Sequence, residues 1–105
     1  MEFKSNVNKL HYLLNESFED VTLEEKSSKD IGNYIQISVK ENLECKIIIT
    51  KKELENNYLN WKYDSNPLNE NSYWVDREST IEELPKLIKD IFEKRRFNFE
   101  YLKKV

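Results

Sequence analysis

The sequence predicts an α+β domain in which an N-terminal and a C-terminal helix flank an antiparallel sheet of about five strands. Apolar residues recur every three or four positions near both ends of the chain, which is the spacing of an amphipathic helix. Between these ends they alternate with polar residues, as in half-buried strands. A chain of 105 residues suffices for one core, so we expect a single domain over residues 1–105.

The two main helices are predicted at residues 5–17 and 80–95. The first has apolar residues at helical spacing, and Ser5 or Asn6 can cap its first turn. The second follows two overlapping capping-box motifs, which begin at Ser79 and Thr80. A short closing helix, capped by Asn98, is expected over residues 97–102.

The strands are predicted from alternation. A short strand within residues 20–25 is followed by a loop over 26–33, and then by strands at Tyr34–Lys40 and Leu43–Thr50. The short turn between the last two requires them to be adjacent and antiparallel. Ile48 lies on the opposite face from Cys45 and Ile47, which favours a central strand covered on both sides. Two further strands are expected around 58–63 and 73–77.

The sequence offers little for catalysis or metal binding. A single cysteine, Cys45, excludes an internal disulfide and a cysteine metal cluster, and its alternation with apolar residues predicts that it is buried. The one histidine, His11, lies on the polar side of its helix. One glycine cannot form a phosphate-cradling loop, and adjacent carboxylates such as Glu24 and Glu25 point in different directions. We therefore expect no cofactor, no metal and no enzymatic activity, although a site of separated carboxylates stays an alternative.

Charge is unevenly distributed along the chain. The net charge is −3, and residues 16–25 contain five acids and no base. An acidic chain matches a phosphate backbone poorly, so we expect no nucleic-acid partner. No apolar run is long enough to cross a bilayer, and the N-terminus lacks the pattern of a secretion signal, so a cytoplasmic protein is expected. The acidic stretch suits a basic protein partner, with a solvated surface as the alternative.

Aromatic residues on the unexpected side of two strands suggest a binding surface. If Leu59, Trp61 and Tyr63 point inward, then Tyr58 points outward, and Trp74 does so if Val75 points inward. Exposed Trp and Tyr near acids are typical of binding hot spots, and Asn60 would lie near the same patch. The alternative is that both sheet faces are covered and Trp74 belongs to the core. The predicted partner-binding residues are Glu16, Glu19, Asp20, Glu24, Glu25, Tyr58, Asp64, Trp74 and Asp76.

The last half of the chain also carries a family-like pattern. It runs through residues 60–63, 72–84 and 88–97 and ends at Tyr101 and Leu102. In these segments the chain resembles small bacterial immunity proteins of polymorphic toxin systems, in particular those of contact-dependent growth inhibition (CdiI). The resemblance implies that the protein binds the C-terminal toxin domain of a cognate effector and blocks it. Many such toxins are nucleases with basic active clefts, and no site residue carries over, because immunity interfaces differ from pair to pair.

The leading hypothesis is therefore a non-enzymatic immunity protein that occludes the active site of a basic toxin domain, with a nuclease as the expected toxin. Acidic side chains would steer the partner, and a few aromatics would slow its dissociation. Two alternatives belong to other classes. One is a small carboxylate-based hydrolase or nuclease accessory domain, and the other is an interaction module without a toxin.

Overall fold

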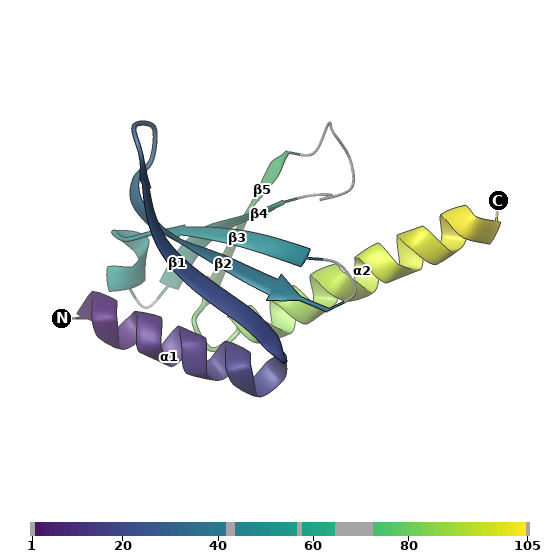
Figure 1. Cartoon of the computed structure of the whole chain (residues 1–105), viewed down its shortest axis with the longest axis horizontal. Helices are drawn as coiled ribbons and strands as arrows, with labels where there is room; N and C mark the ends of the chain where they lie inside the picture. Colours follow the sequence, from purple (N-terminus) through teal and green to yellow (C-terminus); the bar gives the residue numbers. More distant parts are fainter. Residues whose placement is uncertain (1, 42–43, 57, 65–72, 105) are drawn as a thin grey trace.

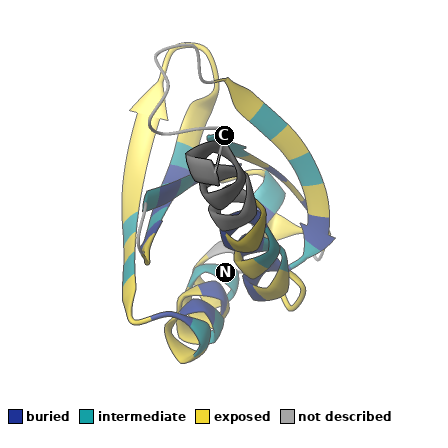
Figure 2. Ribbon diagram, turned by 90° about the vertical axis from the view of Figure 1, so that its right-hand side faces the viewer, coloured by how far each residue is buried: buried dark blue, intermediate teal, exposed yellow. Residues whose placement is uncertain are grey.

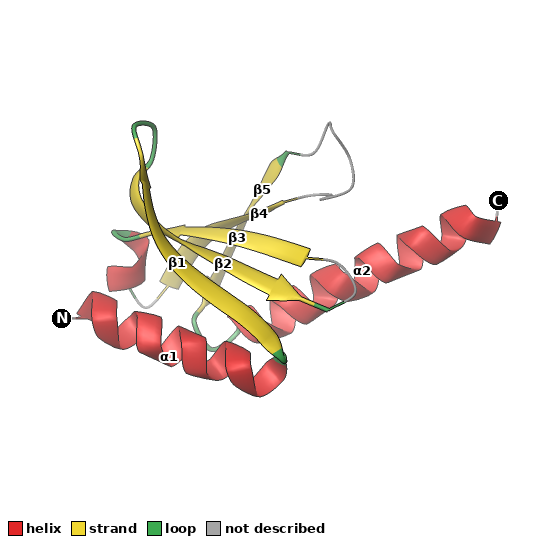
Figure 3. Cartoon of the chain, viewed as in Figure 1, coloured by secondary structure: helices red, strands yellow, loops and turns green. Residues whose placement is uncertain are grey.

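The computed structural model describes residues 2–41, 44–56, 58–64 and 73–104, with side chains for those from residue 4 to residue 94. The chain has the predicted α+β class, with a helix at each end and a five-stranded antiparallel sheet between them (Figures 1 and 3). The elements in order are α1 (Glu2–Ser17), β1 (Asp20–Ser28), β2 (Gly32–Lys40), β3 (Glu44–Thr50), the 3₁₀ helix η1 (Glu53–Glu55), β4 (Tyr58–Asp64), β5 (Trp74–Thr80) and α2 (Leu84–Lys104).

The sheet is a meander in which each strand pairs with the next along the chain. As predicted, β2 and β3 are antiparallel neighbours, with Ile37 opposite Ile47. The ladder between β4 and β5 joins all seven residues of each strand, whereas only two residue pairs join β3 to β4. The sheet is strongly twisted, so β4 and β5 run in a clearly different direction from β1 (Figure 1).

One face of the sheet forms the core with both helices. Buried residues gather where the helices meet the sheet, whereas the edge strand β1 has no buried residue (Figure 2). Cys45 is buried here, as predicted. The core comprises Leu10, Leu14, Phe18, Ile35, Ile37, Val39, Cys45, Ile47, Ile49, Leu54, Leu59, Trp61, Ile81, Leu84, Ile88, Ile91 and Phe92.

The opposite face of the sheet, which we call the outer face, has no described helix packed on it. Ile48 lies there and is half-buried rather than fully covered. The strand β3 is central in the sheet, as predicted, but the expectation that both of its faces are covered is wrong. Large polar side chains on neighbouring strands are sufficient to shield such a residue in part.

Several boundaries differ from the prediction. The first strand continues through Lys26, Ser27 and Ser28, because their backbones pair with β2 although their side chains are polar. The turn that follows ends at Gly32, whose φ of 76° is the left-handed conformation that glycine adopts without strain. The predicted closing helix is not separate, because α2 is continuous to Lys104.

At the other end, α1 begins at Glu2. Asn6 is therefore inside the helix and does not cap it. Its side-chain amide donates a 2.5 Å hydrogen bond to the carbonyl oxygen of Leu54, whose own side chain is fully buried. The segment after β3 forms one turn of 3₁₀ helix, which places Leu54 in the core and connects it to α1.

Two consecutive residues join the sheet to α2. Ser79 points into the core, where its hydroxyl accepts a 3.0 Å hydrogen bond from the indole Nε1 of Trp61 and donates one to the carbonyl of Thr80. Thr80 forms the predicted capping box with Glu83: the Glu83 amide donates to the threonine hydroxyl, and the Glu83 carboxylate accepts from both the hydroxyl and the amide of Thr80. Of the two candidate capping boxes, the one that begins at Thr80 is formed. The hydroxyl of Ser79 cannot cap the helix, because it is buried on the core face of β5.

We predict that Ser79→Ala destabilises the protein. The variant leaves the buried indole N–H of Trp61 without its acceptor, which costs about 1–3 kcal/mol of unfolding free energy. Urea denaturation measures this loss. In the Trp61→Phe background the same serine substitution should cost clearly less, since no indole donor remains; an equal cost in both backgrounds would contradict the role assigned to this bond.

We also predict a pH dependence of stability from the capping box. The bonds that Glu83 accepts from the side chain and the amide of Thr80 hold the pKa of this carboxyl below its ordinary value of 4.5. A carboxyl whose pKa is lower in the folded state stabilises the protein at every pH above its ordinary pKa. This stabilisation is lost as the pH falls through the lowered folded-state pKa. Glu83→Gln and Thr80→Ala should therefore lose less stability than the unchanged protein when urea unfolding is compared at neutral pH and at pH values below 4.5; identical pH profiles would contradict this.

Candidate protein-binding surface

The predicted outward-facing residues gather on one surface, the outer face of the ladder between β4 and β5. Successive side chains of a strand project to opposite faces of the sheet. Because Leu59, Trp61 and Ser79 are buried on the core face, their chain neighbours point to the outer face. We call this surface the β4–β5 outer face. It consists of Tyr58, Asn60, Lys62 and Asp64 from β4, and Trp74, Asp76, Glu78 and Thr80 from β5.

The strand register sets which of these residues are neighbours. Directly opposed pairs are Asp64 with Trp74, Lys62 with Asp76, Asn60 with Glu78, and Tyr58 with Thr80. In the second pair the ammonium of Lys62 lies 2.6 Å from a carboxylate oxygen of Asp76. Both side chains are exposed, so this ion pair contributes little to stability, but it neutralises the charge of Asp76.

The two predicted aromatics are exposed. Trp74 is 45% and Tyr58 is 54% exposed, so the alternative that placed Trp74 in the core is wrong. They do not lie side by side. Six residues of extended strand separate the Trp74 end of the ladder from the Tyr58 end, a distance of about 20 Å. Asp64 lies beside Trp74, while Asp76 and Asn60 lie between the two aromatics.

The excess negative charge of the outer face lies on this ladder. On β1, β2 and β3 the outward charges balance, with Asp20, Glu24 and Glu44 against Lys26, Lys40 and Lys46. On β4 and β5, three acids accompany one base, namely Asp64, Asp76 and Glu78 with Lys62. Exposed aromatic area and excess acid therefore coincide on one half of the face.

Sequence reasoning did not single out Glu78. It lies two residues after Asp76 on the same strand face, so the alternation that selected Trp74 and Asp76 also reaches it. The missing information was the register, which places Glu78 opposite Asn60.

The acidic stretch does not form a single surface. Its five residues are all exposed, but Glu16 belongs to the last turn of α1 and Glu19 to the connection that follows. Glu24 and Glu25 project to opposite faces of β1, and Glu24 lies 3.7 Å from the ammonium of Lys26. These acids contribute a negative field at one edge of the molecule rather than a contact patch.

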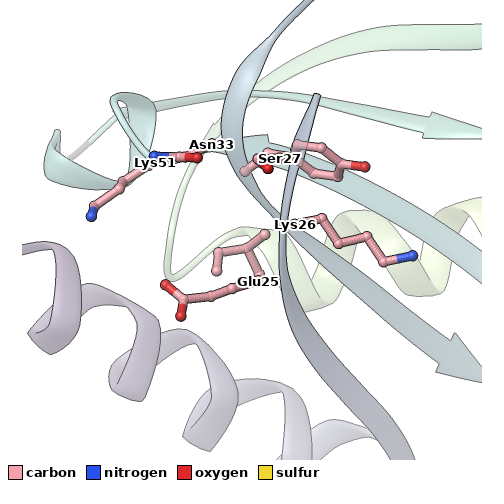
Figure 4. A pocket seen from close by; sticks show the side chains of 7 residues that line it. Glu25, Lys26, Ser27, Asn33 and Lys51 are labelled. Atoms are coloured by element: carbon pink, nitrogen blue, oxygen red, sulfur yellow. The ribbon is translucent and has the colours of Figure 1, made fainter. Parts of the chain in front are cut away.

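A depression of about 400 Å³ lies near the turn that joins β1 to β2. Its lining includes Glu25, Lys26, Ser27, Asn33 and Lys51. The side chains of Glu25 and Lys26 point to opposite sides of the strand (Figure 4). They do not converge on a common point as the groups of a catalytic site would.

The remaining titratable side chains that the structure describes show no pattern of general acid and base. His11 is exposed on α1. The hydrogen bond from Lys9 lowers the pKa of Glu82, which keeps that carboxyl charged rather than able to supply a proton near neutral pH. Within the described parts of the chain, no three His, Cys, Asp or Glu side chains are grouped as metal ligands would be.

Among the helices that the structure describes, none is long and apolar enough to span a bilayer. Comparison with known proteins gives no relative: no protein-family model, no curated protein and no solved structure matches the chain.

Proposed function

We propose that the protein binds a cognate toxin domain through the β4–β5 outer face and neutralises it by covering the toxin's active site. The resemblance of the last half of the chain to immunity proteins suggests this class. The observation that carries the proposal is the exposed indole of Trp74, which lies beside Asp64 on a sheet face that no described helix covers.

The surface suits a binding role for physical reasons. Trp, Tyr and Arg dominate binding hot spots, because each gives a large contact area around a polar group. Here the aromatics are fixed to a regular strand ladder, so little conformational entropy would be lost when a partner packs on them. A carboxylate beside an exposed indole offers an acceptor to a Lys or Arg that approaches the same spot.

The charge distribution favours a basic toxin, and a nuclease is the expected class. A domain that binds nucleic acid presents cations in its cleft, which the excess acids of the β4–β5 outer face complement. The acidic stretch at the β1 edge would act at longer range, because a field of one sign speeds the encounter with an oppositely charged partner. Neutralisation would then need no chemistry on the toxin, only occupation of its cleft.

We predict that Trp74→Ala abolishes protection without unfolding the protein. Truncating a hot-spot aromatic costs about 2 kcal/mol or more of binding free energy, nearly thirtyfold in affinity. Since the indole is 45% exposed, unfolding free energy should fall by less than about 1 kcal/mol. The proposed function implies that the toxin domain is encoded immediately upstream. The measurements are survival of cells that express that domain, and its calorimetric titration with the protein.

Tyr12→Ala is the matched control, because Tyr12 is also a large exposed aromatic, 63% exposed, but it lies on α1. This variant should protect cells fully. Full protection by folded Trp74→Ala would reject the proposed interface, and failure of the unchanged protein to bind the upstream domain would reject the function.

We further predict that the acidic stretch affects association more than dissociation. Neutralising Glu16, Glu19 and Asp20 together should lower the association rate at low salt and leave the dissociation rate nearly unchanged. The difference should shrink in 1 M salt, where the Debye length is about 3 Å. Stopped-flow mixing with the toxin domain tests this, and equal association rates at low salt would assign these acids to ordinary solvated surface.

A further inference from the structure

The Tyr58 end of the β4–β5 outer face is hollowed. A depression of about 730 Å³ is lined by Tyr58, Asn60, Asp76, Arg77 and Glu78. An aromatic ring, an amide and a carboxylate therefore border one space, and all three belong to the outward alternation of the ladder. Tyr58 lies about 20 Å and Glu78 about 13 Å along the ladder from Trp74, so the hollow is centred away from the indole.

Glu78 carries the charge of this hollow. Within the part of the chain that is described, it has no hydrogen-bond or ion-pair partner, whereas Asp76 is neutralised by Lys62. A second carboxylate is close to the hollow, because Glu53 of η1 accepts a 3.2 Å hydrogen bond from the backbone amide of Asn60, one of the lining residues. Arg77 also lines the hollow, but its position belongs to the core-face alternation, where it lies opposite Trp61.

We infer that this hollow receives a cationic side chain, lysine or arginine, from the protein partner. The inference deepens the proposed function, because it assigns a recognition element to the same interface. Each group has a part in it: Glu78 supplies an unneutralised acceptor, Asn60 a neutral acceptor, and the ring of Tyr58 a face over which a cation is stabilised. A guanidinium fits this set best, since it donates in a plane to carboxylate and amide while stacking on a ring.

The positive charge of Arg77 makes the inference sharply testable. A cation in the hollow is attracted by Glu78 on the outer face and repelled by Arg77, which acts from the core-face position of the same strand. Substitutions of these two residues should therefore change the affinity for a cation in opposite directions, with the smaller effect at Arg77. An anion in the hollow would give the reverse signs. The pair of variants Glu78→Gln and Arg77→Gln therefore identifies the charge of the occupant without knowledge of the partner.

The experiment is a titration of the full chain with the blocked tripeptide acetyl-Gly-Arg-Gly-amide at low ionic strength, followed by ¹H–¹⁵N correlation spectra. The amides of Tyr58, Asn60 and Glu78 should shift. The same peptide with citrulline, which has the same shape without the charge, should produce clearly smaller shifts. Glu78→Gln should weaken arginine-peptide binding about two- to fivefold, the range expected for an exposed charge pair, and Arg77→Gln should strengthen it.

The control is Glu93→Gln. Glu93 is an exposed carboxylate on α2 with no partner among the described residues, so its substitution changes net charge equally and should leave binding unchanged. The spectra themselves report whether each variant is folded. Equal shifts with arginine and citrulline, no shift at the hollow, or weaker binding in folded Arg77→Gln would each overturn the inference.

The peptide titration contains no toxin, so its result is independent of the proposed function. If the arginine peptide binds at the hollow while the upstream domain does not bind the protein, the cation site stands and the immunity function falls. If the toxin domain binds but Glu78→Gln leaves both peptide and toxin affinity unchanged, the function stands and the cation site falls.

Discussion

The buried hydrogen bond between Trp61 and Ser79 connects the core with the surface that we propose binds a partner. Trp61 is the largest fully buried side chain, and its indole N–H needs an acceptor within the core. Ser79 supplies it from the next strand, two positions diagonal to the residue directly opposite Trp61. The bond therefore fits only one alignment of β4 with β5. A shift of one residue would turn the indole toward solvent and reverse every side chain of the strand.

This alignment determines both sides of the sheet at once. On the core side, Ser79 is followed directly by Thr80, whose capping box with Glu83 starts the turn into α2, so the direction of the helix follows from the position of the serine. On the outer side, the same register places Glu78 opposite Asn60 and Asp64 opposite Trp74. The surface that we assign to partner binding is thus fixed by a contact that no partner touches.

The fold was predictable from the sequence where the side chains carry the signal. Alternation located four of the strands closely, since a half-buried strand must place apolar residues on one face. It missed the end of β1, because Lys26, Ser27 and Ser28 pair through backbone groups alone. It also divided α2, because the sequence indicates a helix cap at Asn98, whereas the helix continues through this residue to Lys104.

The candidate surface shows the same division. Exposure of Trp74 and Tyr58 followed from the positions of their neighbours, so the sequence identified the face of the sheet on which they lie. The positions along the face did not follow, because they depend on the register of two strands separated by a loop. The sequence therefore suggested one compact patch where the structure has two ends. It also overlooked Glu78, whose proposed role arises from its place opposite Asn60.

The distance between the two ends has a consequence for how such a surface works. The two ends are separated by about 20 Å, which is more than the Debye length of about 8 Å at physiological salt. Charges at one end are therefore screened from those at the other, and each end acts independently. An interface of ordinary size, near 800 Å² on each partner, is wide enough to cover both. A partner that engages only one aromatic end would forgo half of the exposed aromatic area, and one that spans both must present complementary groups at the same spacing. On the proposed function, selectivity for one cognate domain would come from the spacing of two modest contacts on a stiff ladder rather than from a single strong one.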